Sequence, residues 1–81
     1  MAYQGRNNNV DKILIRRDIE GDTLNIWFDD PKLERSCEET GDEVVLSKDS
    51  QGRVIGFEKL NYRVSQAQRE SGKLPIEVRV A

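Results

Sequence analysis

The stretch from Ser47 to Glu58 comes closer to a ligand-binding motif than any other part of the sequence. Its twelve residues, SKDSQGRVIGFE, place Asp49 third, Gly52 sixth, Val54 eighth and Glu58 twelfth. An EF-hand calcium loop has a ligand at the third place, an invariant glycine at the sixth and a bidentate glutamate at the twelfth. Oxygen ligands at this spacing wrap around one ion, so the window raises the question of a calcium site.

Two residues and the flanking sequence argue against calcium. Ser47 stands at the first place, where the loop needs a carboxylate, and Gln51 stands at the fifth. An EF-hand also needs a helix on each side, whereas EVVL and RVIGF are β-branched and aromatic runs of strand length. We therefore expect a hairpin turn here, and no bound cofactor.

Both hairpin turns predicted from the sequence contain an aspartate with a glycine three residues later. Asp49 at the first position of a type I turn accepts a hydrogen bond from the turn backbone, and Gly52 adopts a positive φ in the bulge that follows. Asp18 and Gly21 occupy similar places in the first turn. Gly56 in the strand after the second turn leaves room for a large ring or another chain segment.

Catalytic chemistry has few side chains to rely on, because the chain contains no histidine. Cys37 is its one cysteine, so it cannot form an internal disulfide and has no histidine to activate it. Asp18, Glu20 and Asp22 cluster at one turn and could hold a divalent cation, but turn and capping roles are commoner for such residues. We expect a protein that is not an enzyme, with no metal site.

The bulk composition describes a small protein with a thin core. Its 81 residues are 36% hydrophobic and 35% charged, with a net charge of −2. We expect one domain over residues 10–81, preceded by a disordered or loose arm over residues 1–9. No run approaches the roughly 18 apolar residues of a membrane span. The sequence thus predicts a cytoplasmic protein without a membrane partner.

Two consecutive hairpins account for most of the apolar residues, and they predict a mainly β fold built around a small antiparallel sheet. The first covers about residues 11–28 and the second about residues 43–60. In the first, burial favours pairing Ile15 with Ile26, which leaves Leu14 and Trp27 on the opposite face. In the second, the turn predicts Val45 opposite Phe57.

The remaining segments carry weaker patterns. The linker over residues 29–43 has seven acidic and two basic side chains and predicts a loop with a short edge strand around residues 35–39. A short helix is predicted near residues 64–71, with Ser65 as its cap and Gly72 as its end. Alternation of Ile76, Val78 and Val80 with charged residues predicts a final strand over residues 74–80.

The two hairpin motifs resemble a small bacterial family, the domain-of-unknown-function family 2283. The family pattern Asp-x-Glu-Ala-Asp-x-Leu-Tyr-Ile is matched by DIEGDTLNI, with Gly21 for alanine and Asn25 for tyrosine. The second pattern, Asp-x-x-Gly-x-Ile-Val-Gly-Ile-Glu-Ile-Leu, is matched by DSQGRVIGFEKL. The resemblance spans about residues 10–62 and implies a compact antiparallel sheet with no established activity. Some relatives accompany small toxin-like proteins, which implies by analogy a partner-binding role.

A protein–protein interaction module is the function that these features favour, either as a homo-oligomer or with a small protein partner. The surfaces predicted for it are the face with Leu14 and Trp27 and the strand with Ile76, Val78 and Val80. Weak nucleic-acid binding is an alternative, because the part from Arg53 onward has six basic and three acidic side chains. That surplus offers little counterion release, so nucleic acid is not the expected partner.

Overall fold

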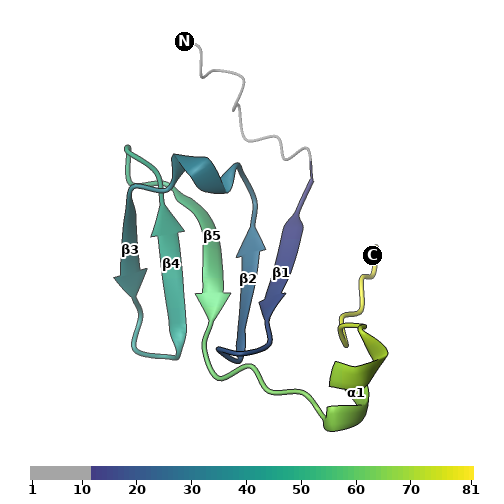
Figure 1. Cartoon of the computed structure of the whole chain (residues 1–81). Coiled ribbons are helices and arrows are strands. Elements are labelled where there is room, and N and C mark those ends of the chain that lie inside the picture. The colour runs from purple at the N-terminus through teal and green to yellow at the C-terminus, as the bar shows by residue number, and fades with distance from the viewer. Residues whose placement is uncertain (1–11) are drawn as a thin grey trace.

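A five-stranded antiparallel sheet forms the centre of the computed structural model, which describes residues 12–81 (Figure 1). The strands are β1 (Leu14–Asp18), β2 (Thr23–Trp27), β3 (Ser36–Glu39), β4 (Val44–Lys48) and β5 (Val54–Lys59). They lie in the order β1-β2-β5-β4-β3, so the β1–β2 and β4–β5 hairpins stand side by side. The predicted fold of two consecutive hairpins in a mainly β protein is confirmed, whereas the predicted arm over residues 1–9 lies outside the described residues.

The β1–β2 hairpin has the register that its apolar residues predict. Ile15 lies opposite Ile26, and Leu14 lies opposite Trp27. A connection of four residues joins the strands, and within it the backbone N–H of Gly21 donates to the Asp18 carboxylate at 3.1 Å. Burial of one apolar face therefore decided this register, because a slip by one residue would turn every side chain to the other face.

The β4–β5 hairpin corrects the register predicted from its turn. Lys48 pairs with Val54 across the turn, as predicted. Ile55 is then an extra residue in β5, so the pairing of β4 with β5 shifts by one residue from Ser47 and Gly56 onward. Leu46 rather than Val45 therefore lies opposite Phe57. The turn rules fix only the first pair of a hairpin, whereas a bulge further along lets the apolar residues of β4 match those of the neighbouring strands.

The acidic linker crosses one end of the sheet and then adds the edge strand β3. It contains one turn of 3-10 helix, η2 (Pro31–Leu33), which Asp30 caps by accepting a hydrogen bond from the backbone N–H of Lys32. The strand predicted around residues 35–39 is present as β3, where every residue is exposed. An exposed, charged edge strand discourages further strand addition at that side of the sheet.

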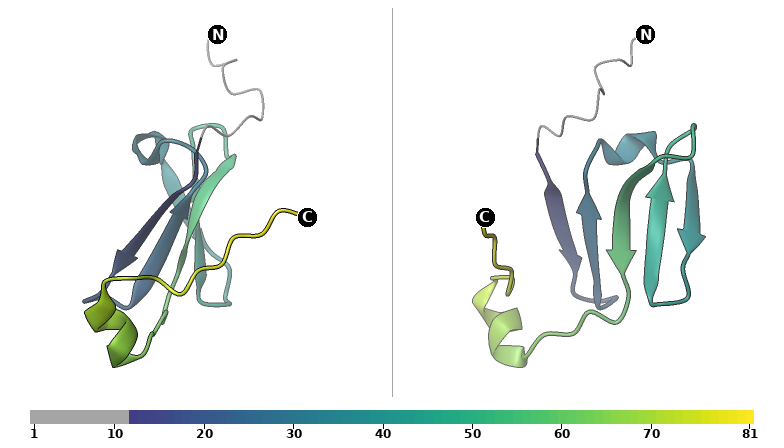
Figure 2. Two further views of the ribbon diagram at one scale, coloured as in Figure 1. Left: turned by 90° about the vertical axis from the view of Figure 1, so that its right-hand side faces the viewer. Right: turned by 180° about the vertical axis from the view of Figure 1, so that it is seen from behind.

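Helix α1 (Gln66–Ser71) follows β5 and stands beside β1, past the edge of the sheet (Figures 1 and 2). Ser65 and Gln68 form a reciprocal capping box at its start, and Gly72 ends it with a φ of 72°. The predicted helix is thus present, two residues shorter at its start. None of its residues is buried, so α1 forms no second layer.

The final strand predicted over residues 74–80 is wrong. The structure has no strand in this segment, and Val78 and Val80 are 84% and 96% exposed. The backbone N–H of Ile76 donates to the carbonyl of Leu74 at 2.8 Å, which bends the chain around Pro75. The alternation of apolar and charged residues gives this segment one apolar side. A strand also needs a neighbouring strand with free backbone groups along its length, and alternation does not supply that.

Candidate interaction surface

The apolar side chains of the sheet gather on one of its two faces. Cα partners form continuous rows from β1 to β3, and one row contains Ile15, Ile26, Phe57, Leu46 and Glu38. Residues two positions apart in a strand lie on the same face, because side chains alternate along it. We call the apolar residues of this surface the apolar face, namely Ile15, Leu24, Ile26, Val44, Leu46, Ile55 and Phe57. Two charged residues, Arg17 and Lys59, lie on the same side of the sheet, in the row of Leu24 and Val44.

Most of the apolar face is only partly shielded from solvent. Leu24 and Ile55 are buried, and the other five residues are half-buried. The ring of Phe28 extends the surface, since it lies 6.1 Å from the ring of Phe57 between centroids. Figure 1 and the right-hand view of Figure 2 show the sheet face-on, with α1 and the tail past its edge. Within residues 12–81, therefore, neither an α-helix nor a second sheet covers the apolar face.

The opposite surface is largely polar, with tryptophan at its centre. We call it the tryptophan face, and it is formed by Leu14, Arg16, Asn25, Trp27, Cys37, Val45, Ser47, Gly56 and Glu58. A Cβ atom at Gly56 would lie 2.8 Å from Cε3 of Trp27, so the indole rests directly on this glycine. Leu14 and Trp27, both predicted to form an interface, are direct partners here and are half-buried.

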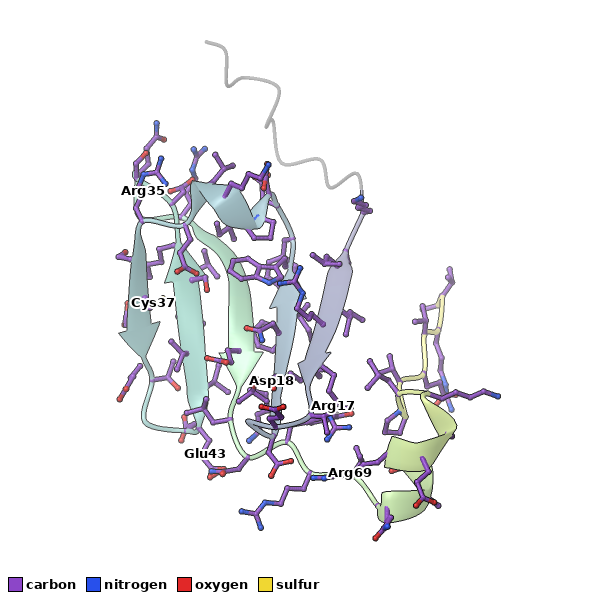
Figure 3. All side chains as sticks on the ribbon, in the orientation of Figure 1. Arg17, Asp18, Arg35, Cys37, Glu43 and Arg69 are labelled. Atoms are coloured by element: carbon purple, nitrogen blue, oxygen red, sulfur yellow. The ribbon has the colours of Figure 1, made fainter. Side chains whose placement is uncertain are left out.

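Opposite charges mark the two edges of the sheet. The β3 edge presents Glu38 and Glu39, and Glu38 forms an ion pair with Lys48 of β4. The β1 edge presents Arg16, which is exposed. Figure 3 shows Arg69 of α1 on this same side of the molecule. The edges therefore differ in sign across the sheet.

Asp22 joins the first turn to the segment that contains α1. Its carboxylate lies 2.8 Å from Nη2 of Arg69, 3.9 Å from Nη2 of Arg17 and 4.0 Å from Nε of Arg63. The side chain of Arg17 is 7% exposed, and its guanidinium lies 5.6 Å from the centroid of the Tyr62 ring. Sequence analysis missed this cluster, because no local pattern joins positions 47 residues apart.

The window that suggested calcium holds a hydrogen-bonded turn. The Asp49 carboxylate accepts hydrogen bonds from the backbone N–H groups of Gln51 and Arg53, and its second oxygen pairs with Nε of Arg53 at 3.1 Å. The backbone bond from Arg53 lowers the pKa of Asp49, with a further contribution from Gln51. Gly52 has a φ of 79°, which other residues adopt at a cost. Both carboxylate oxygens thus serve the turn.

The carboxylates of the first turn have separate partners. Asp18 accepts a hydrogen bond from Gly21, whereas Asp22 pairs with arginines. Among residues 12–81, no group of three or more histidine, cysteine, aspartate or glutamate side chains has the arrangement of a metal site.

Cys37 is an exposed, free thiol on the edge strand β3. Desolvation raises its pKa, and a hydrogen bond with Glu34 raises it further. A raised pKa keeps the thiol protonated near neutral pH, where only the thiolate is a strong nucleophile.

An open hollow lies beside α1, and it is lined by Arg63, Val64, Gln66, Arg69 and Glu70. Arg63 and Arg69 already contact Asp22, and Glu70 accepts a hydrogen bond from Gln66. Polar groups here are directed at one another, so the hollow lacks the convergent arrangement that a substrate site needs.

Comparison with known proteins identifies the hairpins with a family. A family model described as "Protein of unknown function (DUF2283)" matches residues 15–63, which is more than half of the chain. The chain belongs to this family. The match covers the five strands except Leu14 at the start of β1 and ends before α1, so both motifs that resemble DUF2283 lie within it. Searches of curated proteins and of solved structures found no match.

The structure of residues 12–81 also contains no helix that is long and apolar enough to cross a membrane.

Proposed function

We propose that this DUF2283 protein is a non-enzymatic protein–protein interaction module of the cytoplasm, and that it binds through its apolar face. One observation supports this above all: five of the seven residues of that face remain half-exposed on a single-layered sheet. Antiparallel sheets normally pack their apolar face on a second layer, which the described chain does not supply. A partner would supply that layer.

The tryptophan face is the weaker candidate for the main contact. Trp27 already rests on Gly56, and apart from Leu14 its neighbours in the rows are polar or small. Leu14 and Trp27 therefore remain a predicted secondary interface. The exposed residues Ile76 and Val78 of the tail could extend a contact at the β1 side.

Nucleic acid fits the surface less well. Of the six basic side chains from Arg53 onward, five lie within 4.0 Å of a carboxylate, namely Arg53, Lys59, Arg63, Arg69 and Arg79. Such pairing reduces the charge that is available to replace counterions on a phosphate backbone.

A matched pair of substitutions in β4 tests the proposal. Leu46 and Val45 are adjacent half-buried residues that face opposite sides of the sheet. Tagged protein with Leu46→Lys should no longer retain the partner that wild type retains from its host, whereas Val45→Lys should retain it. Far-UV circular dichroism checks that each variant is folded. Ile15→Lys and Leu14→Lys repeat the comparison on an edge strand, where lysine disturbs folding less.

Equal retention by both variants would contradict the choice of face. A wild-type protein that retains neither another protein nor an untagged copy of itself would contradict the interaction function as a whole.

A further inference from the structure

We infer that Asp22 is a two-position switch for the segment that contains α1. In one position its carboxylate accepts a hydrogen bond from Arg69 and holds α1 beside the sheet, and in the other it turns to Arg17 of β1 and releases α1. The released segment lies beyond the DUF2283 match, and the inference does not depend on the apolar face being an interface.

The attachment of α1 to the sheet is slight. Nη2 of Arg69 donates to Oδ1 of Asp22 at 2.8 Å, and no residue of α1 is buried. Solvent screens an exposed pair of this kind, and a helix of six residues is marginal in isolation. The bond from Arg69 to Asp22 therefore decides whether α1 stays in this place.

The chain before α1 has a separate attachment. The backbone N–H of Tyr62 donates to the backbone carbonyl of Asp22 at 2.6 Å, and the Arg17 guanidinium lies 5.6 Å from the centroid of the Tyr62 ring. Neither contact uses the Asp22 carboxylate. Movement of this carboxylate therefore leaves Tyr62 in place and lets the chain turn within residues 63–65, which have no regular secondary structure.

Arg17 carries the donors that the second position needs. Its side chain is 7% exposed, and neither Nε nor Nη2 donates a hydrogen bond to any group of residues 12–81. These two nitrogens form one edge of the guanidinium, which matches the two oxygens of a carboxylate. A buried donor without an acceptor is costly, so the position seen in this structure leaves Arg17 unsatisfied.

Asp22 lies within reach of both arginines. Its Oδ1 is 2.8 Å from Nη2 of Arg69 and 3.9 Å from Nη2 of Arg17, so a shift of about 1 Å brings the second pair to hydrogen-bond distance. Figure 3 shows Arg17 and Arg69 at the same end of the sheet. One charge-assisted hydrogen bond thus replaces another, and the new one is the better shielded from solvent, so α1 is poised to open.

Amide hydrogen exchange of the full chain, followed by NMR, tests the attachment. The backbone N–H of Arg69 donates within α1 to the carbonyl of Ser65 and reports on the helix. Asp22→Asn removes the charge and keeps the φ of 54°, which asparagine adopts readily. Protection of the Arg69 amide should fall about fivefold in this variant, as for one exposed ion pair.

Arg63→Gln is the matched control, because Nε of Arg63 lies 4.0 Å from the same carboxylate. In this control, protection of the Arg69 amide should change by less than about twofold. Backbone amides of β2 check that the sheet is folded in each variant. Unchanged protection in Asp22→Asn, or an equal loss in Arg63→Gln, would overturn the attachment.

The side-chain Nε–H signal of Arg17 tests the second position. Arg69→Gln frees the Asp22 carboxylate, so exchange of the Arg17 Nε–H should slow at least about fivefold, because a new hydrogen bond must break before exchange. Arg63→Gln should leave this rate unchanged, since Arg69 still holds Asp22 there. A purely structural role for Arg69 would loosen the region instead, so unchanged or faster exchange at Arg17 in Arg69→Gln would overturn the switch.

Discussion

Replacing Gly56 by alanine should destabilise the protein, although Gly56 has no positive φ. The added Cβ would lie 2.6 Å from the carbonyl oxygen of Ile26 and 2.8 Å from Cε3 of Trp27. The first contact is with the backbone of the neighbouring strand, so β2 and β5 must move apart to relieve it. Overpacking of this kind costs about 1–3 kcal/mol. Alanine also stiffens the unfolded chain, which returns about 0.4–1 kcal/mol, so the expected net loss is about 1–2 kcal/mol.

Urea denaturation followed by far-UV circular dichroism measures this loss. With a slope of about 1 kcal/mol/M for a small domain, the midpoint should fall by about 1–2 M. Gly52 provides the control, because it has a φ of 79° and nothing within 4 Å of an added Cβ. At Gly52 asparagine should be tolerated better than alanine, since it adopts a left-handed backbone more readily. At Gly56 asparagine should be worse than alanine, because only size matters there. A Gly56→Ala variant as stable as wild type would refute the close strand contact.

Three further predictions concern the turn and the thiol. Asp49→Asn should be less stable than wild type above about pH 4. This difference in stability should shrink as pH falls through the lowered pKa of Asp49, because the charged carboxylate is the form that the turn stabilises. Urea titrations from about pH 2 to 7 measure the difference, and a difference that grows on acidification would contradict the prediction. Calorimetric titration should detect no calcium binding tighter than about 10 µM, because Ser47 and Gln51 replace charged ligands; a tighter site would show that the turn opens to the ion. The rate of Cys37 alkylation, followed as a function of pH, should reach its midpoint at a higher pH than the rate for a free cysteine, because desolvation and Glu34 raise the pKa of Cys37. A midpoint at or below the pH found for a free cysteine would contradict this prediction.

In the second hairpin, local sequence rules predict the turn and its first residue pair but not the register of the rest of the sheet. Asp49 and Gly52 identify the turn and the first pair at Lys48, since both depend on chemistry within a few residues. The bulge at Ile55 depends on the neighbouring chain segment, because the backbone N–H of Phe28, the residue after β2, donates to the Ile55 carbonyl at 2.7 Å. No residue pattern within β4 and β5 predicts this bulge.

The sequence by itself determined the two hairpins, the register of the first, the cap at Ser65 and the family, because alternation, turn residues and capping residues act over short distances. Tertiary structure alone decided that β2 lies beside β5, since this contact joins segments on either side of the acidic linker. It also decided that the tail with Val78 and Val80 forms no strand, because a strand exists only beside a partner with free backbone groups. The same neighbour contacts turned Leu46 and Phe57 onto one face and left that face without a covering layer in residues 12–81, and so moved the proposed interface from Trp27 to the opposite side of the sheet.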